Sequence, residues 1–254
     1  MSLFNIFSCC LSSRPKYYKW KRNQKVFLLD MPDVVTIEIL KNLDFESIRK
    51  LRKVCHAFRD FIDCVKPDSN SKSIYLKVIG NFIVIYTTIP STPSSTNDSF
   101  DLCIDDFLWT RLKHQKSLLD ELSVINKLDF YNILKNVQTF EKMFDRLINV
   151  LESRDRLLKV KSLMISVHGQ DQLMQLLRHI DLKMLKRLEV FRLLEIEELS
   201  DNGDDNSEFV LNLDILKECE NLEKLHVKGF SISSPFRMLT HIPNLKVNMQ
   251  TIWQ

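Results

Sequence analysis

One stretch decides the fold of the N-terminal part of the chain: Phe27-Leu28-Leu29-Asp30-Met31-Pro32-Asp33-Val34-Val35-Thr36-Ile37-Glu38-Ile39-Leu40-Lys41-Asn42-Leu43. Pro32 stands where a helix would begin, and there its missing N–H costs nothing. The apolar residues that follow recur at the spacing of one helix face. They are Val35, Ile39, Leu40 and Leu43. The stretch therefore predicts a short helix that begins at Pro32.

The next residues extend this pattern to two more short helices. Asp44 is a suitable residue to cap the second one. Apolar residues at helical spacing then form two sets, Ile48, Leu51 and Val54 followed by Phe58, Phe61 and Ile62. Three short helices bury little surface by themselves. We therefore expect part of their apolar surface to face a partner.

These residues resemble the F-box, the helical motif that docks a protein onto the Skp adaptor of a cullin-RING ubiquitin ligase. The resemblance rests on Leu28…Met31-Pro32, on Ile39-Leu40-x-x-Leu43-Asp44, and on Leu51-Arg52-x-Val54-Cys55 followed by Phe58-Arg59. Met31 replaces the usual Leu, and Phe58 replaces a frequent Trp. The adaptor-binding residues that the resemblance implies are Leu28, Met31, Pro32, Val35, Ile39, Leu40, Leu43, Leu51, Val54 and Phe58. The alternative is a three-helix cap on a larger domain.

Composition and charge limit the classes of partner that the chain is expected to bind. The chain has 254 residues, enough for a small helical module and one larger domain. Its formal net charge is +3, but residues 1–25 contain six basic residues and no acidic one, so the remainder is slightly acidic. Nucleic-acid binding needs a basic face, and we expect no nucleic-acid partner. The six cysteines form no C-x-x-C pair, which fits an intracellular protein of the cytoplasm or nucleus.

Residues 1–25 are expected to form a basic, disordered tail. The tail also carries Cys9-Cys10 beside a polybasic run. Acylation next to basic residues is typical of a peripheral membrane anchor, so membrane contact through this tail is an alternative.

Beyond an F-box at 26–66 and a polar linker at 67–73, we expect one larger domain at 74–254. Residues 74–78 and 82–86 are rich in β-branched and aromatic side chains and predict a hairpin around Gly80-Asn81. A short helix is expected near Phe107 to Leu112. Helical spacing of apolar residues predicts a longer helix over 137–153.

A weak internal repeat follows in this larger domain. Four segments share the spacing of a leucine-rich-repeat strand: Val160-x-x-Leu163-x-Ile165, Leu185-x-x-Leu188-x-Val190, Leu222-x-x-Leu225-x-Val227 and Ile242-x-x-Leu245-x-Val247. An acidic insertion, Glu195 to Glu208, lengthens one interval. Such units must stack to bury their apolar faces. We therefore predict an α+β or α/β fold, in which the three-helix F-box precedes an irregular leucine-rich-repeat-like domain of parallel strands with backing helices.

The second domain also resembles the FTH-type domain that accompanies F-boxes in nematode proteins. The features that carry this resemblance are the hairpin, Leu134-Lys135-Asn136 and the strand Val160-x-x-Leu163-x-Ile165. The resemblance covers about residues 74–250 in order.

No motif for catalysis, phosphate binding or metal binding occurs, since the four glycines and six histidines are dispersed. We expect no catalytic residue, no cofactor and no metal. His168 and His226 would share the open face of two repeat strands, where a joint site is one possibility and solvent-facing side chains are the commoner case.

With no motif for catalysis or for binding a phosphate or metal, protein recognition is the remaining class of function. Residues that alternate with the buried leucines would form an open face. Its predicted members are Ser162, Met164, Ser166, Arg187, Glu189, Phe191, Lys224, His226, Lys228, Asn244, Lys246 and Asn248. The residues expected to bind a substrate are Met164, Arg187, Glu189, Phe191, Lys224, His226, Lys228 and Lys246.

By resemblance, the chain is expected to be a non-enzymatic, substrate-recruiting subunit of a Skp–cullin–F-box ubiquitin ligase. It would bind a Skp-type adaptor, and through it a cullin, by the F-box, and an unknown target protein by the second domain. One alternative is a protein-interaction scaffold outside any ligase, and another is a component held at a membrane surface by the N-terminal tail.

Overall fold

A computed structural model describes residues 31–43, 45–65, 67–80, 82–88, 98–99, 104–127, 133–193 and 209–249. The chain divides into two compact units, Met1–Asp68 and Ser69–Gln254, and each is described by itself. The expectations for the tail at 1–25, for Leu28 and for the acidic insertion at 195–208 lie outside the described residues.

The first unit contains the three predicted helices, which confirms them. They are α1 (Asp33–Asn42), α2 (Phe45–Val54) and α3 (His56–Val65). Their small core consists of Leu40, Ile48, Phe61 and Ile62. Arg52 of α2 and Asp63 of α3 form a bidentate pair, with Nε–Oδ1 and Nη2–Oδ2 distances of 2.9 and 3.1 Å. A bidentate pair of this kind adds geometric specificity to the packing of the two helices.

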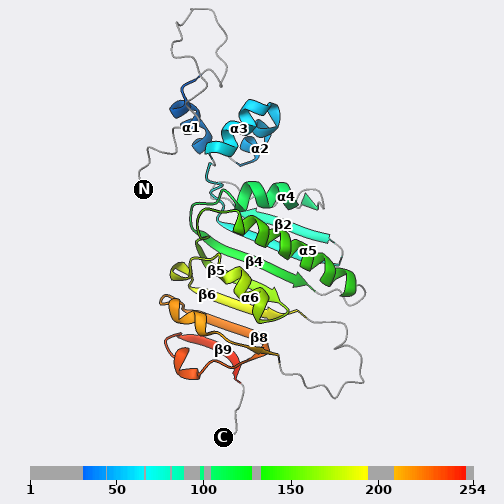
Figure 1. Cartoon of the computed structure of the whole chain (residues 1–254), viewed down its shortest axis with the longest axis vertical. Helices are drawn as coiled ribbons and strands as arrows, with labels where there is room; N and C mark the ends of the chain where they lie inside the picture. The colour runs from blue at the N-terminus through cyan, green and yellow to red at the C-terminus, as the bar shows by residue number, and fades with distance from the viewer. Residues whose placement is uncertain are drawn as a thin grey trace, which may run out of the picture. The chain divides into compact units, whose positions relative to one another are not determined.

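The second unit is built on one sheet. Its strands in the described residues are β1 (Ser73–Ile79), β2 (Phe82–Thr88), β3 (Asp98–Ser99), β4 (Leu119–Lys127), β5 (Val160–Val167), β6 (Arg187–Arg192), β7 (Val210–Leu211), β8 (Lys224–Ile232) and β9 (Asn244–Met249). Strand order is β3-β2-β1-β4-β5-β6-β8-β7, and β9 pairs with the other side of β8 (Figure 1). The hairpin β1–β2 and the pair β2–β3 are antiparallel, whereas every other pair is parallel.

The repeat predicted from leucine spacing is confirmed as a ladder of parallel strands. The central leucine of each segment pairs with that of the next, in the order Leu122, Leu163, Leu188, Leu225 and Leu245. The first four of these side chains are fully buried. The leucine spacing begins at β4, whose sequence Leu119-x-x-Leu122-x-Val124 matches the repeat and was not predicted as a strand.

Helices cover one face of this sheet. The helix α5 (Ile133–Glu152) confirms the prediction over 137–153 and begins one turn earlier, and α6 (Gln170–Leu177) follows β5. Both helices lie on the same face of the sheet (Figure 1), and their buried side chains share one hydrophobic core with the ladder leucines. Phe140 and Phe144 of α5 are buried against it. The opposite face of the sheet is left without a helix among the described residues.

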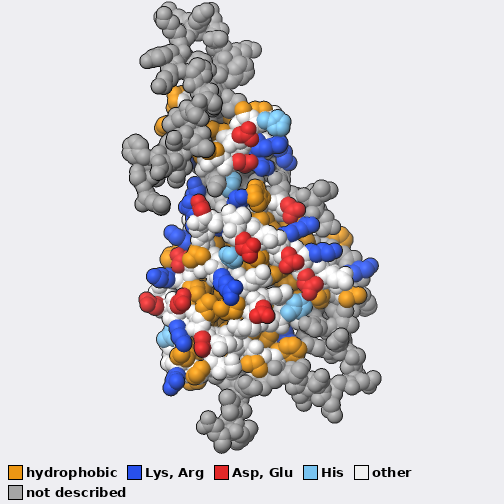
Figure 2. All heavy atoms as spheres, in the orientation of Figure 1, with side chains coloured by type: hydrophobic (Ala, Val, Ile, Leu, Met, Phe, Trp, Pro, Cys, Tyr) orange, Lys and Arg blue, Asp and Glu red, His pale blue; other side chains and the backbone are white. Residues whose placement is uncertain are grey.

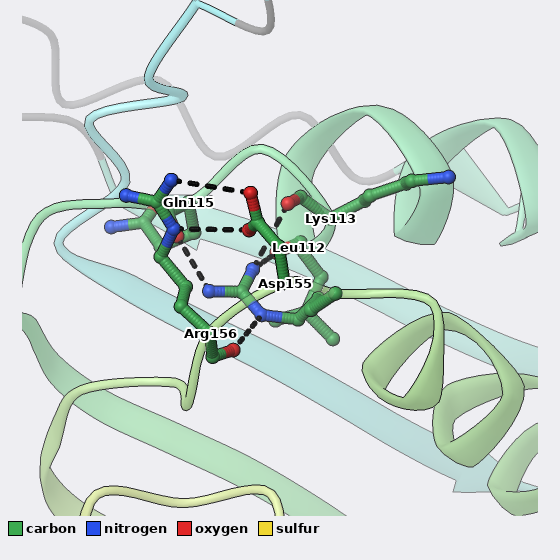
Figure 3. A network of polar contacts seen from close by, with 6 residues as sticks. Leu112, Lys113, Gln115, Asp155 and Arg156 are labelled. Atoms are coloured by element: carbon green, nitrogen blue, oxygen red, sulfur yellow. Dashed lines mark hydrogen bonds and ion pairs between the residues drawn. The ribbon is translucent and has the colours of Figure 1, made fainter. Parts of the chain in front are cut away.

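A short helical segment confirms the expectation near Phe107 to Leu112. The helix α4 (Ile104–Phe107) continues as a π-helical turn over Leu108–Leu112. The Arg154 guanidinium ties this turn to the end of α5 by donating hydrogen bonds to the carbonyl oxygens of Leu112, Lys113 and Gln115 (Figure 3).

The polar segment expected to be a linker, 67–73, is tied to the second unit. The Gln115 side chain accepts a hydrogen bond from the Ser71 N–H at 3.2 Å and donates one to the Ser71 carbonyl at 3.0 Å. Ser69 and Ser71 are both buried. The compact unit accordingly starts at Ser69, several residues before the first predicted strand.

Candidate protein-binding surfaces

The helices of the first unit expose some of the residues expected to bind an adaptor. Val35 and Val54 are 44% and 66% exposed, and Pro32 is also exposed. The half-buried members of the predicted set are Met31, Ile39, Leu43 and Leu51. Val34, next to Val35, is 72% exposed and was not in the predicted set. An exposed apolar side chain on a small helical unit is a candidate contact for a partner.

Two residues of the predicted adaptor-binding set lie inside the unit. Leu40 is 1% exposed and Phe58 is 7% exposed. Leu40 packs with Ile48, Phe61 and Ile62. In this structure Leu40 and Phe58 shape the unit, so an effect of either residue on a partner would act through the fold. Direct contact by any member of the set stays a prediction.

The second candidate surface is the helix-free face of the sheet, which we term the open face. Alternation along each strand places polar and aromatic residues there, opposite the buried leucines. Register then aligns them into rows across the sheet. One row is Tyr86, Tyr75, Ser123, Met164, Glu189, His226 and Lys246.

The structure brings the predicted substrate-face residues together in these rows. Arg187 lies opposite Lys224, and Phe191 lies opposite Lys228. Met164 and Phe191 are half-buried. The Phe191 ring meets the His226 ring edge-on at 5.8 Å between centroids. Whether these residues bind a target stays a prediction.

Sequence reasoning missed the part of the open face that belongs to β1, β2 and β4. Tyr75 and Tyr86 stack there with 4.9 Å between ring centroids, and Phe82 is 68% exposed beside Ile79. Ile125 of β4 lies in the next row. The spacing of Leu119, Leu122 and Val124 was the signal that would have found β4 and extended the face.

Glu189 is the electrostatic centre of the face over β6 and β8. Its carboxylate lies 2.6 Å from Lys224 Nζ and 3.7 Å from His226 Nδ1. Burial by itself would raise the pKa of Glu189, but the hydrogen bond and charge of Lys224, with the neighbouring His226, outweigh burial and lower it. Glu189 is thus held as a carboxylate that neutralises part of the surrounding positive charge.

The cluster of Tyr75 and Tyr86 presents aromatic rings, whereas the group around Glu189 presents charges. The Tyr75 hydroxyl donates to Glu121 Oε2 at 3.1 Å. Burial, together with the negative charge of Glu121, raises the pKa of Tyr75. Tyr75 therefore stays neutral and presents an apolar ring beside Tyr86, with the Lys77 ammonium 5.2 Å from the Tyr86 ring centre.

The two histidines expected to share a face are separated. His168 follows β5, and its Nε2 lies 3.4 Å from Glu141 of α5 on the helix-covered side. His226 faces Glu189 on the open face. Within the described residues no cluster of three or more metal-ligating side chains exists. None of the described helices has the length and apolar character that spanning a bilayer requires.

These two units define a class of protein. Residues 28–70 match the F-box domain, which covers α1 to α3. An F-box domain in general indicates a substrate-recognition subunit of Skp–cullin–F-box ubiquitin ligases, and such subunits are typically non-catalytic adaptors.

The second unit allows a more specific assignment of the domain family. Residues 141–253 match the FTH domain, so the chain combines an F-box domain with an FTH domain. The FTH match begins within α5 and contains β5 to β9; it leaves out β1 to β4, including the hairpin that carried part of the resemblance. No curated protein and no solved structure matches the chain.

Proposed function

We propose that the chain recruits a target protein to a Skp–cullin–F-box ubiquitin ligase. The F-box helices bind a Skp-type adaptor, and the open face of the second unit binds the target. The chain performs no bond chemistry. It raises the concentration of a target lysine near the conjugating enzyme that the cullin complex carries elsewhere.

The observation that carries this proposal is the apolar surface of the first unit. Val35 and Val54 are large and exposed on a unit whose apolar core cluster is small, with Leu40, Ile48, Phe61 and Ile62 as its buried members among the described residues. Burying one valine side chain in an interface contributes about 1.5–3 kcal/mol. Two such contacts contribute enough to support specific docking of a small helical motif.

Adaptor binding tests the proposal most simply. A pull-down with a purified Skp adaptor compares the wild-type chain with Val35→Gln/Val54→Gln. Because each change removes about 1.5 kcal/mol of apolar contact, the double variant is expected to bind about a hundredfold more weakly.

A matched control comes from the same two helices. Glu38→Gln/Lys53→Gln introduces the same new side chains at exposed positions and leaves the net charge unchanged. We expect it to bind like the wild type, since an exposed ion pair such as Glu38–Lys41 contributes little. Absence of adaptor binding by the wild-type chain would exclude the ligase function.

A further inference from the structure

Charge is unevenly distributed over the open face. Its part over β6, β8 and β9, which we term the basic end, comprises Arg187, Glu189, Phe191, Lys224, His226, Lys228, Asn244, Lys246 and Asn248. These positions hold four lysine or arginine side chains and a single carboxylate. The part over β1 and β2 instead holds Tyr75, Tyr86 and Phe82 with one lysine, Lys77, over the Tyr86 ring. One surface therefore offers aromatic contacts at one end and positive charge at the other.

The register of the basic end places like charges next to one another. Arg187 lies directly opposite Lys224, so two permanent cations share one register position. Neighbouring strands are about 4.8 Å apart, and like charges in this arrangement are destabilising. Glu189 relieves only part of this repulsion, because its carboxylate is paired with Lys224 at 2.6 Å.

Three cations of the basic end have no carboxylate partner among the described residues. They are Arg187, Lys228 and Lys246, and all three side chains are exposed. The face that carries α5 is different, since Glu141, Lys142, Asp145 and Arg146 alternate along it and both signs are interspersed (Figure 2). The unbalanced positive charge thus belongs to the helix-free side.

We propose that the basic end of the open face binds an acidic segment of the protein that the chain recruits. Carboxylates of that segment meet Arg187, Lys228 and Lys246, where they supply the charge that the fold leaves uncompensated. Half-buried Phe191 and Met164 provide apolar contact beside them. This inference rests on the proposed function of the open face in target recruitment and adds the chemical class of the target segment.

A peptide selection tests this proposal without requiring the adaptor. Random dodecapeptides displayed on phage are selected against the immobilised full chain, and the enriched peptides are synthesised and titrated by fluorescence anisotropy. We expect enrichment of Asp and Glu. We also expect binding to weaken at least about tenfold in Arg187→Gln/Lys228→Gln/Lys246→Gln, and to weaken when salt rises from about 0.05 to 0.3 M, since screening acts on exposed charges.

The control variant removes the same number of positive charges, but from the helix-covered side of the sheet. Lys135→Gln/Lys142→Gln/Arg178→Gln changes exposed residues on α5 and just after α6. Its peptide affinity should stay within about twofold of wild type, since these charges lie outside the contact. If the triple open-face variant does not fold, Lys246→Gln alone on the edge strand β9 should still weaken binding measurably. Adaptor pull-down of the same variants should be unchanged, so failure of adaptor docking is recognised separately.

Three results would overturn the proposal. One is that the selection yields no acidic peptide. Another is that acidic peptides bind the open-face variant and the wild type equally. The third is that a single-stranded oligonucleotide of mixed sequence binds the chain more tightly than the selected peptides, which would assign the basic end to nucleic acid instead.

Discussion

At the scale of single residues, buried or half-buried polar groups fix the irregular parts of the second unit. Arg154 is the clearest case. Its guanidinium caps the C-terminal end of the π-helical turn Leu108–Leu112, with donor–acceptor distances of 3.1 Å to the Lys113 carbonyl and 2.7 Å to that of Gln115 (Figure 3). A helix end leaves its last carbonyl oxygens without the regular intrahelical donors, and the arginine donates to two of them here.

Arg154→Lys should destabilise the protein by about 2–3 kcal/mol, since an ammonium cannot make the forked set of charged hydrogen bonds. Urea unfolding measures the difference. The control is Arg156→Lys two residues later, where the pair with Asp155 is half-exposed and the change should cost less than about 0.5 kcal/mol. Equal effects of the two substitutions would contradict this role of Arg154.

Glu189 predicts a pH dependence of stability. Its pKa is lowered in the folded protein, so it contributes stability that is present above its ordinary pKa and is lost as the pH falls through the folded pKa. The free energy of unfolding should therefore differ between the wild type and Glu189→Gln by about 1 kcal/mol at neutral pH, a modest value because Lys224 is partly exposed.

This difference should shrink as the pH falls from about 5 to 3. Glu223→Gln is the control, because its pair with Lys186 has the same 2.6 Å distance but is half-exposed on both sides. A stability difference for Glu189→Gln that does not change between these pH values would contradict the assignment.

At the scale of elements, the long strand β8 has to change partners along its length. Residues 224–228 pair with β6, and Ser231 and Ile232 pair with β7. The register of β8 with β9 shifts between the same positions. Gly229 lies at this shift with a φ of +85°, which favours glycine.

Gly229→Ser should destabilise the second unit by about 2 kcal/mol or more, because the backbone angle is unfavourable for a side chain and the new Cβ would lie 2.7 Å from Arg192 Cβ. Thermal unfolding followed by circular dichroism measures it. Gly169→Ser is the matched control, since open space surrounds Gly169 and serine is a good N-cap for α6. Equal melting temperatures of the two variants would contradict this role of Gly229 at the strand shift.

Elements with a strong local pattern could be predicted from the sequence. The helices α1 to α3, α5 and the parallel strands β5, β6, β8 and β9 follow from apolar spacing, and the hairpin follows from its β-branched and aromatic residues. The strand β4 has the same spacing, but the long helix α5 separates it from β5 and hides the repeat. The two-residue strands β3 and β7 have no detectable pattern, since only their neighbours define them.

The candidate surfaces could be predicted only in part. Alternation with buried leucines correctly placed Arg187, Glu189 and His226 on one face, because a pleated strand leaves no other choice. The pairing of Glu189 with Lys224 depends on strand order, which the spacing does not contain. Likewise, the burial of Leu40 and Phe58 depends on how three helices pack, not on the pattern of any one of them.

At the scale of the whole molecule, the chain has two separate cores. Among the described residues, the first is a small cluster around Leu40, Ile48, Phe61 and Ile62, and the second spans the sheet, α5 and α6. A small core contributes little stability, and any partner that binds only the folded unit stabilises it by mass action. The two units thus suit two roles, in which the first docks on an adaptor and the second presents the open face.

Complex formation tests the central claim most directly. Full-length chain, purified Skp adaptor and a cullin–RING pair are mixed and separated by size exclusion with light scattering. We predict a single species that contains one copy of each component, with Val35→Gln/Val54→Gln eluting alone and Glu38→Gln/Lys53→Gln remaining in the complex. Elution of the wild-type chain apart from the adaptor and cullin would contradict the account of this protein as a ligase subunit.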